Sequence, residues 1–137
     1  MASFSKKERK LSVTVRDQLF KEGTVLFYYP YKIFYMLDQA DAASAGCSIV
    51  ISVPKRNFSR AVDRNRIKRQ IREAYRLNNS LLNNSLHTHC MRIHILCLYL
   101  PDEHTATALL FHKMESLMAK FAKIVAQSGA LSAHRAD

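Results

Sequence analysis

The stretch that decides the fold lies between residues 47 and 78 and reads CSIVISVPKRNFSRAVDRNRIKRQIREAYRLN. Its first part alternates apolar side chains at Ile49, Ile51 and Val53, a spacing of two that predicts a β-strand over residues 47–53. Pro54 has no backbone N–H to donate to a sheet, so the strand is expected to end there and a loop over residues 54–58 to follow.

The second part of the stretch predicts a helix over residues 59–78. Ile67, Ile71, Ala74 and Tyr75 recur at the three- and four-residue spacing that places side chains on one face of an α-helix. With about 100° of rotation per residue, the polar side chains that fall on roughly the opposite side are Asn65, Lys68, Arg69, Arg72 and Arg76. Such a helix packs its apolar stripe against a sheet and presents its cations to solvent.

The positive charge of the chain is concentrated in this helix and in the loop before it. The whole chain has a formal net charge of +10. Residues 55–76 hold nine Lys and Arg against two Asp and Glu, a net charge of +7, whereas residues 77–137 have a net charge of only +1. Arg guanidinium groups match phosphate oxygens in a planar fork, and few acidic side chains stand one helical turn away to neutralise them. The segment therefore predicts a surface that binds a phosphate polyanion.

The flanking segments predict an α+β layer fold. Before the deciding stretch we expect a helix over residues 12–22 capped by Ser12 and stopped by Gly23, one or two strands within 24–37 with Pro30 at a bend or edge, and a loop over 38–46. After it we expect a loop over 78–84, a strand over 91–100, an amphipathic helix over 105–127 and a frayed tail over 128–137.

Length and composition indicate one domain over residues 1–137, with 1–10 and 128–137 expected to be flexible. The chain has 137 residues, of which 48% are hydrophobic, enough for one core. No apolar run approaches the roughly 20 residues that span a bilayer, and the polar start lacks a secretory signal, so we expect a cytoplasmic protein with no membrane partner. The odd cysteine count favours reduced thiols in the core: Cys47, Cys90 and Cys97.

The deciding stretch resembles the bacterial ribonuclease P protein component. The resemblance is carried by Ser52-Val53-Pro54-Lys55-Arg56, then by Ala61-Val62-Asp63-Arg64-Asn65-Arg66-Ile67-Lys68-Arg69 and Arg72-Glu73-Ala74. Phe20-Lys21-Glu22-Gly23 also resembles the end of the family's first helix. The likeness implies a compact α-β sandwich of ribosomal-protein-like fold, with a four-stranded sheet, three helices and a left-handed β-α-β crossover.

The resemblance also implies a function. A member of this family is the accessory protein subunit of an endoribonuclease whose RNA subunit removes the 5′ leader from precursor tRNA. Its partners would be the catalytic RNA and precursor tRNA, with no further protein required and with Mg²⁺ held mainly by the RNA. The residues that would bind the catalytic RNA are Lys55, Arg56, Arg60, Arg64, Asn65, Arg66, Lys68, Arg69, Arg72 and Arg76.

A second surface is expected to hold the leader. Single-stranded RNA is bound by stacking on aromatic rings inside a cationic groove. Family members place the leader in a cleft between the first helix and the sheet, which in this chain points to Phe20, Lys32 and Phe34. Arg16 stands where relatives often carry an aromatic side chain. Core burial remains the alternative for each of these rings.

The sequence predicts no catalytic and no metal-binding side chains. His87, His89, Cys90 and His94 match no structural zinc spacing, and Asp and Glu do not cluster as protein-bound Mg²⁺ requires. Three other classes stay open at this point: a ribosomal or ribosome-assembly protein, a DNA-binding protein that uses residues 59–78 as a recognition helix, and a self-sufficient nuclease.

Overall fold

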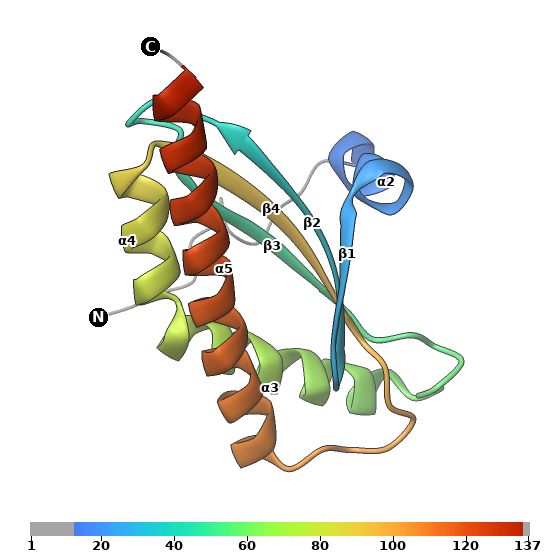
Figure 1. Ribbon diagram of the computed structural model, residues 1–137. Helices are drawn as coiled ribbons and strands as arrows, with labels where there is room; N and C mark the ends of the chain where they lie inside the picture. Colours follow the sequence, from blue (N-terminus) through green and yellow to red (C-terminus); the bar gives the residue numbers. More distant parts are fainter. Residues whose placement is uncertain (1–12, 136–137) are drawn as a thin grey trace.

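The structure is a computed structural model that describes residues 13–135, with side chains described for 16–129 (Figure 1). Ser12 and residues 1–10, of which the sequence predicted a helix cap and a flexible end, lie outside the described residues. The elements follow in the order α2 (Val13–Glu22), β1 (Thr24–Tyr28), β2 (Tyr31–Gln39), β3 (Gly46–Ser52), α3 (Ala61–Asn78), α4 (Ser80–Thr88), β4 (Met91–Tyr99) and α5 (Thr107–Arg135).

The strands form one four-stranded sheet in the order β1-β2-β4-β3. β1 and β2 are an antiparallel hairpin closed at Tyr29-Pro30, a cis peptide bond, where the sequence predicted a bend. β2 also pairs antiparallel with β4, and β4 pairs parallel with β3. Because parallel neighbours need a long connection, α3 and α4 form the crossover between β3 and β4. The expected α+β class, four-stranded sheet and β-α-β crossover are therefore confirmed.

The two faces of the sheet are covered unequally. Alternate residues such as Ile33, Ile49 and Ile95 point into the main core, where α3, α4 and α5 cover them. The opposite alternation places Phe34 and Leu96 on the other face, where Leu19 of α2 packs against them. Figure 1 shows α4 and α5 side by side on one side of the sheet, with the short α2 set apart from them. We call the two faces the helical face and the α2 face.

The predicted loop over residues 78–84 was wrong. Ser80–Thr88 is helix α4, so the described residues contain four helices where three were expected. Leu82 and Leu86, four residues apart, are fully buried in the main core, and the polar Asn side chains face outward or lie at the helix ends. Tertiary packing of these two leucines outweighs the turn preference of the Asn pairs.

Two smaller predictions also need correction. Cys47 and Cys97 are free, buried thiols as expected, but Cys90 is exposed, because it occupies the turn before β4 with a φ of 51°. α5 continues to Arg135, past the end predicted at Gln127. None of the helices in the described part of the chain is long and apolar enough to cross a membrane.

Candidate RNA interface

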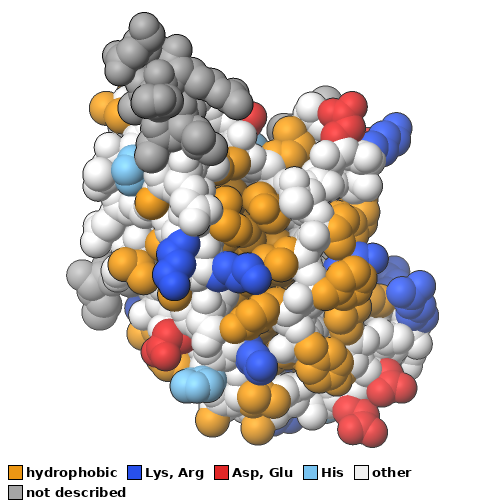
Figure 2. Space-filling view, in the orientation of Figure 1, with side chains coloured by type: hydrophobic (Ala, Val, Ile, Leu, Met, Phe, Trp, Pro, Cys, Tyr) orange, Lys and Arg blue, Asp and Glu red, His pale blue; other side chains and the backbone are white. Residues whose placement is uncertain are grey.

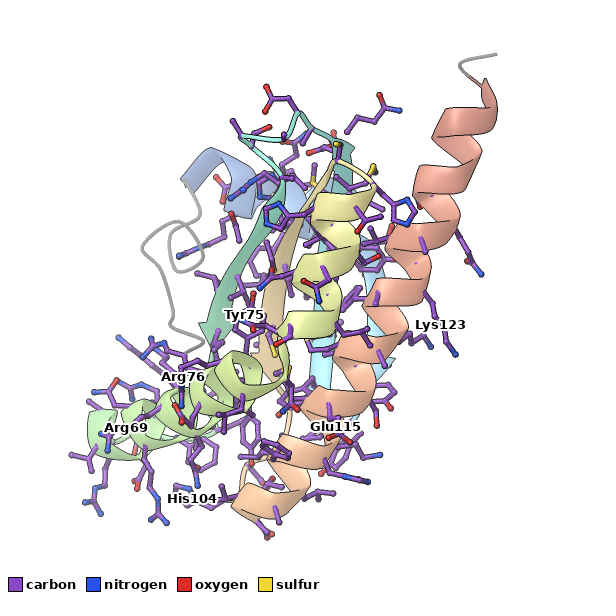
Figure 3. The ribbon with its side chains drawn as sticks, turned by 90° about the vertical axis from the view of Figure 1, so that its left-hand side faces the viewer. Arg69, Tyr75, Arg76, His104, Glu115 and Lys123 are labelled. Atoms are coloured by element: carbon purple, nitrogen blue, oxygen red, sulfur yellow. The ribbon has the colours of Figure 1, made fainter. Side chains whose placement is uncertain are left out.

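The basic surface consists of the predicted cations and amide on α3 and the loop before it. Ile67, Ile71, Ala74 and Tyr75 are buried in the main core, as their spacing predicted. Arg69 and Arg76 project from α3 in Figure 3. The members of the surface that are exposed are Lys55, Arg56, Arg60, Asn65, Arg66, Arg69 and Arg72, and those that are half-buried are Arg64, Lys68 and Arg76.

The half-buried Arg64 fixes the start of the helix. Its Nη1 donates to the carbonyl oxygens of Phe58 at 2.8 Å and of Ser59 at 2.9 Å. His104, from the loop before α5, is labelled in Figure 3. Its Nε2 lies 3.5 Å from an Asp63 carboxylate oxygen, and its ring centre lies 5.3 Å from that of Phe58, with the two rings tilted. These contacts hold the basic loop and the first turn of α3 in one orientation. Arg64 therefore has a structural role at the start of α3 as well as a positive charge.

The last turn of α3 carries a partly neutralised cation. The Arg76 guanidinium donates to both carboxylate oxygens of Glu73, from Nε at 3.0 Å and from Nη2. This bond lowers the pKa of Glu73 and raises the pKa of Arg76, so both stay charged at neutral pH. Arg66, Arg69 and Arg72 are exposed and form no ion pair with an acidic side chain among the described residues. The free charge is therefore densest in the middle of α3.

The predicted leader residues meet on the α2 face as one aromatic cluster. Lys32 Nζ lies 5.0 Å from the ring centre of Phe27 and 5.2 Å from that of Phe34, and the Phe20 and Phe34 rings are 5.1 Å apart. Phe20 is 53% exposed and Phe27 is 67% exposed, but Phe34 is only 8% exposed. Phe34 thus forms the buried base of the cluster, against the sheet, and Phe20, Phe27 and Lys32 form its solvent-facing surface.

Strand register and one tight helix end assemble this cluster. Phe27 pairs with Lys32 across the β1–β2 hairpin, so both point to the α2 face. α2 ends at Gly23, where a Cβ would collide with the carbonyl oxygen of Leu19, and the Gly23 N–H donates to that same oxygen at 3.0 Å. The stop predicted at Gly23 is confirmed, and it sets Phe20 above Phe34.

Sequence reasoning missed Phe27 as a member of the cluster. The alternation of Val25 and Phe27 on β1 was a signal, since both are exposed on the same face. This alternation assigns Phe27 to the cluster only when the register of the β1–β2 hairpin is known. The sequence also missed three lysines on α5, at positions 113, 120 and 123, because acidic side chains nearly balance the basic ones in the average over residues 77–137. The acidic residues are Asp102, Glu103, Glu115 and Asp137. Figure 2 shows blue side chains along α5, and Lys113 Nζ lies 5.4 Å from the Tyr28 ring.

The two surfaces lie on opposite faces of the sheet but approach each other at one end. Lys32 pairs with Leu98, and Leu98 pairs with Ser52, so these three residues form one row across the sheet. The loop with exposed Lys55 and Arg56 begins directly after this row. The loop with Lys55 and Arg56 therefore lies at the end of the sheet that also carries Lys32 of the aromatic cluster.

The other end of the α2 face is polar. Arg92 donates to the Ser44 carbonyl oxygen at 3.1 Å and to the Ser48 hydroxyl, and His94 Nε2 lies 3.8 Å from an Asp38 oxygen. Burial lowers the pKa of His94, and the nearby Arg92 charge lowers it further, while Asp38 opposes both. Among the described residues no group of three or more His, Cys, Asp or Glu is placed to hold a metal ion.

Residues 4–123 match the sequence profile of the family described as Ribonuclease P. The chain belongs to that family. The ribonuclease P protein component of Porphyromonas gingivalis is 41% identical over 102 residues, which are 72% of each chain. That of Nitrosococcus oceani is 34% identical over 65 residues, which are 47% of this chain and 51% of the relative. The resemblance drawn from the basic stretch is thereby confirmed.

Solved structures of the ribonuclease P family share the fold. The RNase P protein of Staphylococcus aureus superimposes with a TM-score of 0.62 at 22% identity, covering 88% of this chain and 99% of that one. The RNase P protein of Thermotoga maritima gives a TM-score of 0.64 at 19% identity, covering 82% and 96%. At these identities the likeness supports the fold alone.

Proposed function

We propose that this chain is the protein subunit of a bacterial ribonuclease P and assists its RNA in removing the 5′ leader from precursor tRNA. The observation that carries the proposal is the row of exposed, unneutralised arginines on α3, in a chain whose family match covers residues 4–123. Exposed Arg66, Arg69 and Arg72 offer guanidinium forks to the phosphates of a folded RNA.

The aromatic cluster would hold the leader. A base would stack on the exposed ring of Phe20 or Phe27, and the ammonium group of Lys32, next to the Phe27 and Phe34 rings, would meet the backbone phosphate. The loop with Lys55 and Arg56 would guide the strand toward the RNA bound on α3. The two surfaces then serve two parts of one ribonucleoprotein.

No side chain of this chain is assigned to bond cleavage. Mg²⁺ prefers hard oxygen ligands in octahedral geometry, and the phosphates of the RNA subunit supply them. Mg²⁺ would thus be held mainly by the RNA, and the protein would act by binding both RNAs.

The test is reconstitution at low Mg²⁺. The full chain, a bacterial ribonuclease P RNA and a 5′-labelled precursor tRNA are combined, with each component omitted in turn. We expect leader removal only when both the RNA subunit and the protein are present. Cleavage by nuclease-free protein alone would contradict the proposal, as would equal binding of ribosomal RNA with no stimulation of cleavage.

A further inference from the structure

A groove between α3 and α5 lies beside the basic surface and shares Arg69 with it. It has a volume of about 330 Å³ and is lined by Arg69, Gln70, Glu73, Ala74, Leu77, Thr107 and Phe111. This volume is at the lower end of the roughly 300–1,000 Å³ typical of small-molecule sites. The groove therefore has room for one flat ring system.

The walls of the groove are apolar. Leu77 is 51% exposed and the Phe111 ring is half-buried, so both offer apolar area that the fold leaves partly open. Ala74 is buried, and its small side chain leaves space between the two larger side chains. A flat aromatic ligand would cover this area by stacking.

One polar atom in the groove is unusual. Gln70 Nε2 donates to the Thr107 hydroxyl at 2.9 Å, which ties α3 to the first turn of α5. Its Oε1 is buried and has no hydrogen-bond partner among the described residues. A buried acceptor without a donor costs free energy, so the groove favours a ligand whose edge carries an N–H.

The charge at the rim indicates what kind of ligand this is. Arg69 belongs both to the groove lining and to the row of exposed cations on α3. Figure 3 shows Arg69 on α3. Arg69 at the rim therefore favours a ligand with a phosphate on its outer side, as a nucleotide within an RNA chain has.

We propose that the groove between α3 and α5 receives one unpaired base of the RNA that α3 binds. The base lies between Leu77 and Phe111, an N–H on its edge donates to Gln70 Oε1, and the adjoining phosphate binds Arg69. Amide side chains recognise base edges in this way, and unstacked bases in loops and bulges are the usual targets. This inference rests on the proposed function, because it assumes the RNA bound by α3.

The test fills the groove without touching the cations. Leu77→Trp places a bulky side chain in the groove, and Leu81→Trp is the matched control, since Leu81 on α4 is similarly exposed at 57% and does not line the groove. Binding of each full-length variant to a bacterial ribonuclease P RNA is measured over a series of salt concentrations. The RNA is also probed base by base with dimethyl sulfate, alone and bound.

We expect Leu77→Trp to weaken binding by about tenfold, the loss of one stacked base, with an unchanged salt slope. Leu81→Trp should bind within about twofold of the unsubstituted chain. One unpaired base should be protected by the unsubstituted chain and by Leu81→Trp, and should become reactive with Leu77→Trp. Gln70→Met keeps the volume of the side chain but removes the amide, and it should also make this base reactive. If a thermal melt shows that Leu77→Trp is unfolded, the protection pattern of Gln70→Met tests the inference in its place.

Three outcomes overturn the inference. Unchanged affinity and protection in Leu77→Trp would mean that no base enters the groove. A smaller salt slope would mean that the substitution disturbs the cations instead. A shift from dimer to monomer in sedimentation would assign the groove to a second copy of the chain. If the unsubstituted chain itself neither binds this RNA nor stimulates leader removal, it is the proposed function that fails.

Discussion

The basic surface and the aromatic cluster differ in how the chain builds them. The basic surface comes from one continuous segment, residues 55–76, which forms α3 and the loop before it. The aromatic cluster joins Phe20 of α2, Phe27 of β1, and Lys32 and Phe34 of β2. A surface on one helix depends on local periodicity, whereas the cluster depends on the hairpin register and on the packing of α2. The four predictions that follow test this difference, and the largest effect comes first.

The largest effect is expected from Phe34→Ala. Phe34 is 8% exposed and packs with Leu19 and Leu96, so its truncation leaves a cavity and should cost about 3–5 kcal/mol of unfolding free energy. Phe20→Ala, at an exposed ring, should cost less than about 1 kcal/mol of that stability. Chemical denaturation of both variants measures the difference. Equal costs would show that Phe34 does not form the buried base of the cluster.

The next effect concerns the basic surface. Arg66→Ala combined with Arg72→Ala removes two exposed cations and leaves Arg69 of the groove in place. Affinity for ribonuclease P RNA should fall roughly a hundredfold at low salt, and the slope of log K against log salt should shrink by somewhat under one unit per lost phosphate contact. Stability should change little, because neither side chain is buried.

A matched control removes the same charge elsewhere. Lys120→Ala combined with Lys123→Ala takes two exposed cations from α5. If both double variants lose the same affinity, the chain binds RNA through its net charge alone, and α3 has no special part in it. A loss confined to the Arg66 and Arg72 variant supports α3 as the binding surface.

The same difference explains how much the sequence could predict. Strand β3, helix α3 and its buried stripe follow from local spacing, and the structure confirms them within one or two residues. The position of the basic charge needed no tertiary information either. These features depend on side chains within a few residues of one another, which is the range over which periodicity is informative.

Most of the missed features depend on distant contacts. The sequence predicted a loop in place of helix α4 because the Asn pairs favour turns. The helix is stabilised by the burial of Leu82 and Leu86 against other elements, which the local sequence does not show. Phe27 joins the cluster through a strand partner, and Cys90 is exposed because the chain turns at that residue. The groove between α3 and α5 joins residues 69–77 to residues 107–111, which no local pattern connects. The order of the strands was not predicted, and the four-stranded sheet with its crossover came only from the family resemblance.

A smaller and more selective effect is expected at the open rings. Phe20→Ala or Phe27→Ala should weaken binding of precursor tRNA to the assembled enzyme by about 1–3 kcal/mol, the worth of one base stacked on an aromatic ring. Mature tRNA has no leader, so its binding should barely change. Tyr29→Ala is the control, since Tyr29 is similarly exposed but lies at the turn of the hairpin. Equal losses for precursor and mature tRNA would rule the ring out as a leader contact.

The smallest effect separates the polar end of the α2 face from its aromatic end. Burial and the Arg92 charge lower the pKa of His94 in the folded chain, so the unfolded chain, whose histidine pKa is about 6.5, takes up the proton first. The free energy of unfolding should therefore not depend on His94 at higher pH. It should fall as the pH drops through about 6.5 and should level off below the pKa that His94 has in the folded chain. His94→Gln should remove part of this fall, and His112→Gln, at an exposed position on α5, serves as the control. The measurement is the free energy of unfolding between about pH 8 and pH 5. If His94→Gln keeps the full pH dependence, the fall comes from other groups, and His94 does not set the acid sensitivity of this face.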